Sequence, residues 1–103
     1  VNIYPAEIEG EILAHPGVGD VAVFGIPDDD MGEQIKAVVE PAPGQLGGDE
    51  LAASIMEHLS GRLARFKSPR SIDFVDELPR EPTGKLLKRQ LRDPFWEGRD
   101  RAI

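Results

Sequence analysis

The sequence predicts an α+β fold, in which a β-hairpin and a third strand form a small sheet flanked by about three helices. The chain has 103 residues, and its content of 40% apolar and 30% charged residues is typical of an ordinary globular domain. Helical periodicity alternates with β-rich composition in the order helix, strand, strand, helix, strand, helix. The sequence contains no internal repeat and no sign of a second domain, so one small domain is expected.

The first element is expected to be a helix over residues 5–14. Pro5 suits the first position of a helix, and Ile8 and Ile12 share one helical face because they lie four residues apart. Residues 15–17 include a proline and a glycine and should end the helix.

Two strands should follow at residues 18–26 and 34–40, joined by an acidic turn over residues 27–32. The second strand alternates between two sets of side chains, which should face opposite sides of the sheet. One set is Ile35, Ala37 and Val39, and the other is Lys36, Val38 and Glu40. The short connection predicts that the two strands pair as an antiparallel hairpin.

A loop rich in proline and glycine, residues 41–48, precedes the clearest helix of the sequence. Asp49 should cap this helix. Its apolar residues recur at every fourth position, as Leu51, Ile55, Leu59 and Leu63. Further along, residues 71–75 predict a third strand, residues 78–84 a loop with prolines, and residues 86–91 a short last helix.

The ends of the chain suggest a piece of a longer protein. The chain begins with Val1 rather than methionine, and its first residues already have the character of ordered structure. Residues 93–103 are charged and lack periodicity, so a frayed tail is expected there. No long apolar run and no signal-peptide pattern occurs, so neither membrane insertion nor secretion is expected. The absence of cysteine is consistent with a cytoplasmic protein.

Charge is unevenly distributed along the chain, whose net charge is −7. Residues 1–50 contain eleven acidic residues and one basic residue, whereas residues 51–103 contain eleven basic and eight acidic residues. The basic half suits a ligand with phosphate groups, but the acidic half would repel a nucleic-acid backbone. A small phosphorylated ligand is therefore expected, and a nucleic-acid partner is not.

Two groups of residues have some features of metal sites. His15 and His58 are too few and too isolated in the sequence to form one. The acids at positions 28–30 and 33 do not follow the order of ligands and glycine in a calcium-binding EF-hand loop. No metal site is expected in this chain.

The segment PREPTGKLLKR, residues 79–89, contains a Gly-Lys pair like that of a phosphate-binding P-loop. The rest of that pattern is absent, since Pro79 occupies the position of its first glycine and Leu86 that of its serine or threonine. Taken alone, Lys85 after the Thr83-Gly84 turn is more typical of a solvated surface charge than of a catalytic group.

Four segments together resemble the adenylate-forming acyl-CoA synthetases, a family of AMP-binding enzymes. They are VNIYPAEIEGEI (1–12), PDDDMGE (27–33), RFKSPRSIDFVDELP (65–79) and PTGKLLKR (82–89), in the family's order and spacing. The resemblance implies that residues 1–92 are the mobile C-terminal lid domain of such an enzyme, without its large N-terminal adenylation domain. The NIYPAEIE form is more similar to acyl-CoA synthetases than to peptide-synthetase adenylation domains.

The resemblance implies a two-step reaction in the complete enzyme. A carboxylate attacks the α-phosphate of ATP to give acyl-AMP and pyrophosphate, and the thiol of coenzyme A (CoA) then displaces AMP. The lid rotates between the two steps. ATP, Mg²⁺ and CoA belong to the complete enzyme. This chain alone is expected to hold none of them as a cofactor and to bind ATP and CoA only weakly. The acid is expected to be a fatty acid or a similar carboxylic acid.

Lys85 matches the catalytic lysine of the family, which stabilises negative charge in the first step. Thr83 and Gly84 belong to the loop that carries it. An ammonium on a long, flexible side chain can be inserted and withdrawn with the lid. Pro79 and the Gly84-Lys85 pair also match the PxxxxGK pattern at which family members are acetylated, so Lys85 is a candidate acetylation site.

The resemblance places the CoA site on the opposite face of the lid, after the long helix. Phe66, Lys67 and Arg70 match the aromatic and basic residues expected there, since a ring can stack on adenine and cations can pair with phosphates. Phe66 alternatively caps the core. The chain departs from some relatives at Ser68, where they carry a base, and at Met31, where they often carry tryptophan. Met31 is equally compatible with simple packing of the turn.

Two alternatives stay open at this level. In one, the chain is the lid of an adenylation domain that passes its acyl group to a carrier protein rather than to CoA. In the other, it is a freestanding interaction module without catalysis, although the intact Lys85 argues against this. For an enzyme, the expected partners are the N-terminal adenylation domain, the carboxylic acid and CoA.

Overall fold

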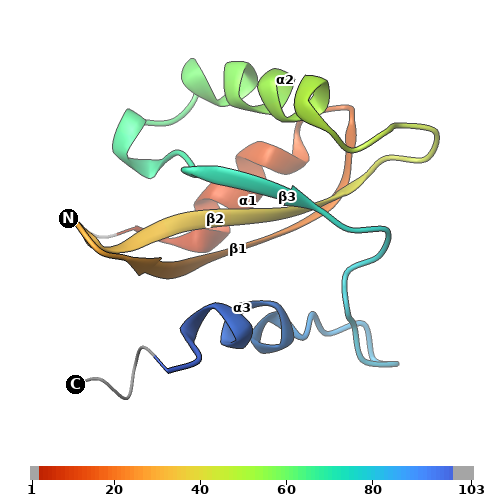
Figure 1. Ribbon diagram of the computed structural model, residues 1–103. Coiled ribbons are helices and arrows are strands. Elements are labelled where there is room, and N and C mark those ends of the chain that lie inside the picture. The colour runs from red at the N-terminus through yellow and green to blue at the C-terminus, as the bar shows by residue number, and fades with distance from the viewer. Residues whose placement is uncertain (1–2, 99–103) are drawn as a thin grey trace.

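The computed structural model describes residues 3–98 (Figure 1). Its elements are α1 (Pro5–Leu13), β1 (Val18–Asp28), β2 (Gly32–Pro41), α2 (Asp49–Ser60), the 3₁₀-helix η1 (Arg65–Lys67), β3 (Ser71–Phe74) and α3 (Lys88–Trp96). The α+β class and the expected order of helices and strands are confirmed. None of the helices in this part of the chain is long and apolar enough to cross a membrane.

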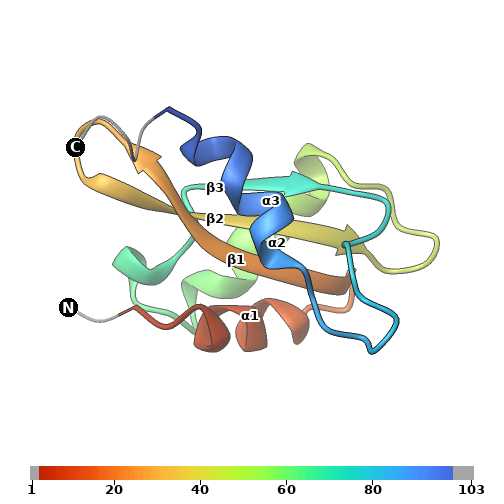
Figure 2. The same cartoon turned by 90° about the horizontal axis from the view of Figure 1, so that it is seen from below.

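The three strands form one sheet in the order β1-β2-β3. β1 and β2 pair as the expected antiparallel hairpin, whereas β3 runs parallel to β2. A parallel neighbour requires a long crossover connection, which the segment containing α2 provides. α1 and α2 cover one face of the sheet and α3 covers the other (Figures 1 and 2).

The hydrophobic core has two parts, one on each face of the sheet. The part under α1 and α2 includes Ile8, Ile12, Val23, Val39, Ile55 and Leu59, each at most 1% exposed. The part on the α3 side contains Ala22, Phe24, Ile26, Val38 and Leu78. Neighbouring residues of β1 and β2 therefore face opposite parts of the core, as the alternation in the sequence predicted.

Lys36 on β2 is buried, with 6% of its surface exposed. Its Nζ lies 2.9 Å from Asp73 Oδ1 on β3 and 5.4 Å from the centroid of the Phe95 ring on α3. The ion pair and the cation–π contact offset the cost of removing this charge from water. A lysine on the α3 side of the sheet is therefore compatible with the core around it.

Two expectations about α2 are wrong. Asp49 is the first residue of the helix rather than its cap, because Gly48 occupies the cap position and no side chain caps this helix. Asp49 instead places a negative charge in the first turn, where the helix dipole favours it. The helix also ends at Ser60, so Leu63 is buried in the segment that follows.

α3 begins at Lys88 and continues to Trp96, into the segment for which a frayed tail was expected. Contacts with β1 hold this part of the helix. The Trp96 indole donates a hydrogen bond to the Gly25 carbonyl (2.8 Å), and the Phe95 ring centroid lies 6.1 Å from that of Phe24. Residues 99–103 of the expected tail, like residues 1 and 2, lie outside the described part of the chain.

Two histidines that are far apart in the sequence connect α1 to α2. The rings of His15 and His58 meet edge to face, with centroids 5.4 Å apart. His15 Nδ1 accepts the Gly17 N–H (2.8 Å), so His15 Nε2 carries the proton and donates to Ser54 Oγ (2.8 Å). His58 Nε2 donates to the Glu11 carbonyl (2.8 Å). Because the Nδ1 atom of His15 accepts a hydrogen bond, this arrangement requires a neutral ring at His15.

The stability of the domain should fall in mild acid because of His15. Burial, and next the neighbouring His58, lower the pKa of His15 below its ordinary value of 6.5. As the pH drops through 6.5, the unfolded chain binds a proton that the folded chain still excludes, so the free energy of unfolding should decrease.

Urea unfolding from about pH 8 to about pH 5 would measure this loss of stability. The variant His15→Asn should reduce the pH dependence, because asparagine still accepts the Gly17 N–H but does not titrate. A pH dependence that is the same in both proteins would contradict the assignment to His15.

Candidate functional site

The loop that carries Lys85 is an ordered hairpin. The Glu81 N–H donates to the Lys85 carbonyl (2.9 Å), and the Gly84 N–H donates to the Glu81 carbonyl (2.7 Å). Residues 82–84 thus form a three-residue turn with Glu81 and Lys85 at its base. Lys85 therefore has a defined backbone position.

Gly84 has a backbone conformation that side chains disfavour, with φ of +94°. A Cβ atom at this position would meet no other atom within 4 Å, so the requirement for glycine is conformational rather than steric. Thr83 lies beside it and is exposed. The glycine lets the chain turn directly before Lys85.

The Lys85 side chain is exposed. No hydrogen bond or ion pair connects its ammonium to another residue in the range 3–98. A positive charge on a four-carbon side chain, carried by an ordered turn, is available to an anionic ligand.

Arg80 ties this hairpin to the first strand. Its Nη1 donates to the Gly84 carbonyl (2.6 Å), and its Nε and Nη2 donate to Asp20 Oδ2 at 3.1 and 2.6 Å. Asp20 lies in β1, next to an irregularity in strand register between Val18 and Asp20. Arg80 and Asp20 lie 60 positions apart and no local pattern links them, so their contact could not be predicted from the sequence.

The residues expected to bind CoA lie together around η1. Phe66 is 54% exposed, so the alternative in which it caps the core is wrong. Lys67 Nζ lies 5.9 Å from the Phe66 ring centroid and 3.1 Å from Glu7 Oε1 on α1. The Glu7 carboxylate therefore already neutralises part of the positive charge of Lys67. The Arg70 side chain is 64% exposed, with Nη1 3.9 Å from Asp28 Oδ2. The cluster offers an exposed ring and a weakly paired guanidinium.

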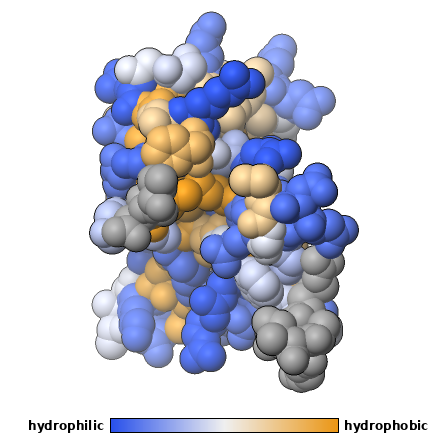
Figure 3. All heavy atoms as spheres, turned by 90° about the vertical axis from the view of Figure 1, so that its left-hand side faces the viewer, coloured by the Kyte–Doolittle hydropathy of each residue, from blue (hydrophilic) through white to orange (hydrophobic). Residues whose placement is uncertain are grey.

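The Lys85 hairpin and the η1 cluster lie at opposite ends of the domain (Figures 1 and 2). The β1–β2 turn lies at the η1 end, and its Met31 is 74% exposed, so Met31 does not pack the turn. Figure 3 shows this end, where apolar side chains gather in the middle and hydrophilic ones surround them. The longest dimension of the domain is 43 Å, so a compact ligand contacts one end at a time.

In the acidic turn between β1 and β2, a carboxylate accepts a hydrogen bond from a backbone N–H of the same turn. β1 continues to Asp28 and β2 starts at Gly32, so the turn is shorter than the expected 27–32. Asp28 Oδ1 accepts the Asp30 N–H (2.9 Å), and this bond is the main cause of a lowered pKa at Asp28. Within residues 3–98, no group of three or more His, Cys, Asp or Glu side chains is arranged to hold a metal ion.

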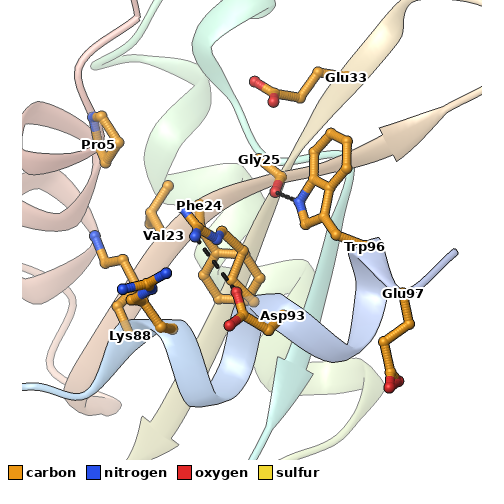
Figure 4. A pocket seen from close by; sticks show the side chains of 11 residues that line it. Pro5, Val23, Phe24, Gly25, Glu33, Lys88, Asp93, Trp96 and Glu97 are labelled. Carbon is orange, nitrogen blue, oxygen red and sulfur yellow. Dashed lines mark hydrogen bonds and ion pairs between the residues drawn. The ribbon is translucent and has the colours of Figure 1, made fainter. Parts of the chain in front are cut away.

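A groove of about 590 Å³ lies between β1, the start of α1 and α3 (Figure 4). Lys88 Nζ is 2.9 Å from Glu9 Oε2, which also accepts the Val23 N–H (2.8 Å). The indole of Trp96 binds the Gly25 carbonyl nearby. These side chains cover polar groups at the free edge of β1, where an unpaired strand would otherwise recruit another chain. The groove contains none of the predicted site residues.

Comparison with known proteins identifies close relatives. A family model described as AMP-binding enzyme C-terminal domain matches residues 7–85. The chain is 43% identical over 102 residues to a fatty acid–[acyl-carrier-protein] ligase of Streptomyces coeruleorubidus, and 50% identical over 95 residues to a feruloyl-CoA synthase of an Amycolatopsis species. These alignments cover 99% and 91% of this chain but 19% and 18% of the relatives, so the chain spans less than a fifth of their length.

Solved structures agree with these relatives. An acyl-CoA synthetase of Brucella canis has a TM-score of 0.84 and 42% identity, over 90% of this chain and 17% of that protein. ATP-bound MatB from Rhodopseudomonas palustris has a TM-score of 0.82 and 42% identity, over 95% of this chain and 19% of that protein. In both cases the similarity is to a small part of a much larger protein.

Proposed function

Because the chain belongs to the family of AMP-binding enzyme C-terminal domains, we propose that it is the mobile lid of an ATP-dependent acyl-CoA synthetase, an acid–thiol ligase. The lid extends through the end of α3 at Trp96, beyond the expected boundary at residue 92, and a large N-terminal domain supplies the binding sites for ATP and for a fatty acid or similar acid. The main support is the separation of two exposed clusters at opposite ends of the domain. A lid that rotates between two reaction steps needs two such faces.

In the first step, Lys85 stabilises negative charge. The carboxylate of the acid attacks the α-phosphate of ATP, the new O–P bond forms, and pyrophosphate leaves with the electrons of the broken bond. The Lys85 ammonium reaches the carboxylate and α-phosphate oxygens and holds the charge in place during the attack. It keeps its proton and forms no covalent bond. The ordered Gly84 turn supports this role because it fixes the base of the side chain.

In the second step, the η1 end of the lid faces the reaction centre. Phe66 stacks on the adenine of CoA and Arg70 pairs with its phosphates, while the thiol displaces AMP from the acyl group. The exposure of both side chains supports this assignment. Lys67 contributes less, because Glu7 already neutralises much of its charge.

The complete enzyme uses Mg²⁺ together with ATP. When bound, the ion would offset negative charge on the phosphates. Within residues 3–98, no group of three or more His, Cys, Asp or Glu side chains is arranged to hold it. Most of the surface that contacts ATP and CoA also belongs to the N-terminal domain, so the isolated chain binds both only weakly.

The proposal predicts that this chain alone is inactive, whereas the full-length enzyme makes acyl-CoA. Both proteins would be incubated with ATP, Mg²⁺, CoA and a panel of carboxylic acids, and the release of pyrophosphate and the formation of acyl-CoA would be measured. Robust acyl-CoA formation by the isolated chain would contradict the proposal. So would the absence of pyrophosphate release by the full-length enzyme with every acid tested.

A second candidate function is the lid of an enzyme that loads a carrier protein. The 43% identity to a fatty acid–[acyl-carrier-protein] ligase favours it. The first step and the role of Lys85 would be the same, but the thiol would arrive on a protein, and Phe66 and Arg70 would contact that protein. Supplying the full-length enzyme with free CoA or with a carrier protein separates the two functions by the product formed. A non-catalytic module of the same fold would give no adenylation at all.

A further inference from the structure

We propose that Arg80 and Asp20 are positioning residues for Lys85. Together they hold the hairpin in the orientation that presents the Lys85 ammonium during adenylation. The proposal rests on the adenylation role assigned to Lys85. It adds two residues that act through the hairpin and do not themselves touch the substrate.

The contact is made directly before Lys85. Arg80 Nη1 donates to the carbonyl of Gly84 at 2.6 Å. This carbonyl belongs to the planar peptide unit that leads into Lys85, so holding it fixes the orientation of that plane. The direction in which the Lys85 side chain leaves the backbone is thereby restricted.

The other side of the guanidinium is attached to the sheet. Nε and Nη2 of Arg80 share Asp20 Oδ2 at 3.1 and 2.6 Å, and Asp20 Oδ1 accepts the N–H of Val21 at 2.9 Å. The Asp20 side chain is 22% exposed, so water screens this ion pair only partly. The register irregularity next to Asp20 is of the kind that re-aims a side chain out of a strand. Arg80 therefore links an exposed hairpin to a buried strand.

Arginine suits this position better than lysine. Its planar guanidinium carries several N–H donors in a fixed arrangement, so it can bind the carboxylate and the carbonyl at the same time. A lysine at position 80 would keep the charge but lose this rigid connection. A charge-stabilising group works best when its position is set before the reaction begins, and a displacement of about 1 Å can cost about a hundredfold in rate.

Kinetics of the full-length enzyme would test the proposal through the variants Arg80→Ala, Arg80→Lys and Asp20→Ala. Arg80→Ala should lower kcat for adenylation by about 10- to 100-fold, with KM for ATP within about twofold. Arg80→Lys and Asp20→Ala should each cause a smaller loss of the same kind. Thioester formation from supplied acyl-AMP should stay normal, which also shows that the variants fold. Arg62→Ala, which removes an exposed cation after α2, is the matched control and should change neither step.

A double substitution distinguishes positioning from direct contact with ATP. If Arg80 acts through Lys85, then Arg80→Ala should cause no further loss of adenylation in a Lys85→Ala enzyme, whereas a direct contact would add its own loss. Hydrogen–deuterium exchange supplies an independent measurement, since the backbone N–H groups of residues 80, 81 and 83–87 should exchange faster in Arg80→Ala.

Three results would overturn the positioning role and leave the proposed function intact. They are normal adenylation in Arg80→Ala or Asp20→Ala beside a large loss in Lys85→Ala, additive losses in the double variant, and unchanged exchange of the hairpin amides. Normal adenylation in Lys85→Ala would overturn both the positioning role and the proposed function.

Discussion

Replacing Lys85 with alanine in the full-length enzyme should lower the rate of adenylation by about 10²- to 10³-fold or more, the range for loss of a preorganised charge-stabilising group. The side chain is exposed and has no partner within residues 3–98, so its removal should leave the fold intact. The loss would therefore report on the chemistry. Pyrophosphate exchange and single-turnover formation of acyl-AMP measure this step.

Thioester formation by the same variant, started from supplied acyl-AMP, should stay close to normal because the proposed function assigns that step to the η1 end of the lid. Lys85→Arg is the matched control, since it keeps a positive charge and should recover part of the lost rate. If Lys85→Ala slowed both steps equally, Lys85 would not act in adenylation alone.

Acetylation of Lys85 would remove the same charge and should give the same pattern of rates. Enzyme shown by mass spectrometry to be acetylated at Lys85, yet fully active in adenylation, would contradict this expectation.

The variants Phe66→Ala and Arg70→Ala should show the reverse pattern. Each should raise the apparent KM for CoA by about tenfold or more. Phe66→Ala would remove the proposed stacking on the adenine base, and Arg70→Ala would remove the proposed charged hydrogen bond to phosphate. Pyrophosphate exchange should be largely unaffected, since the proposed function assigns adenylation to the other end of the domain. Steady-state kinetics at varied CoA, together with exchange assays without CoA, separate the two effects.

Two further variants serve as controls for this prediction. Lys67→Ala should have a smaller effect on KM, because Glu7 already pairs with Lys67. Leu46→Ala removes an apolar side chain that is 89% exposed in the loop between β2 and α2, away from η1, and should change nothing. An unchanged KM for CoA in both Phe66→Ala and Arg70→Ala would place the CoA site elsewhere.

Local patterns in the sequence predicted most of the fold. The spacing of Ile8 and Ile12 predicted α1, and alternation along residues 34–40 predicted both β2 and the faces that its side chains occupy. Helical periodicity predicted α2, although it suggested a helix as far as Leu63. These features could be predicted because each depends on residues that are close in the sequence and on the fixed periods of helices and strands.

The candidate site could be predicted only in part from the sequence. A turn before Lys85 could be predicted from Thr83 and Gly84, because the left-handed conformation at Gly84 is a local requirement. The role proposed for Lys85 came from the order of several motifs, since a Gly-Lys pair alone has no specific meaning. The grouping of Phe66 with Arg70 was also within reach, because η1 and the residues that follow are contiguous.

The sequence by itself thus determined the helices, the hairpin, the faces of the strands and the glycine turn before Lys85. The tertiary structure decided the parallel pairing of β3 with β2, the extension of α3 through Trp96, the attachment of Arg80 to Asp20 and the separation of the two clusters. Each of these depends on contacts between residues far apart in the chain, such as Trp96 with Gly25. These contacts stabilise the fold only when the helices and the sheet pack together, so the periodicity of a single segment cannot predict them.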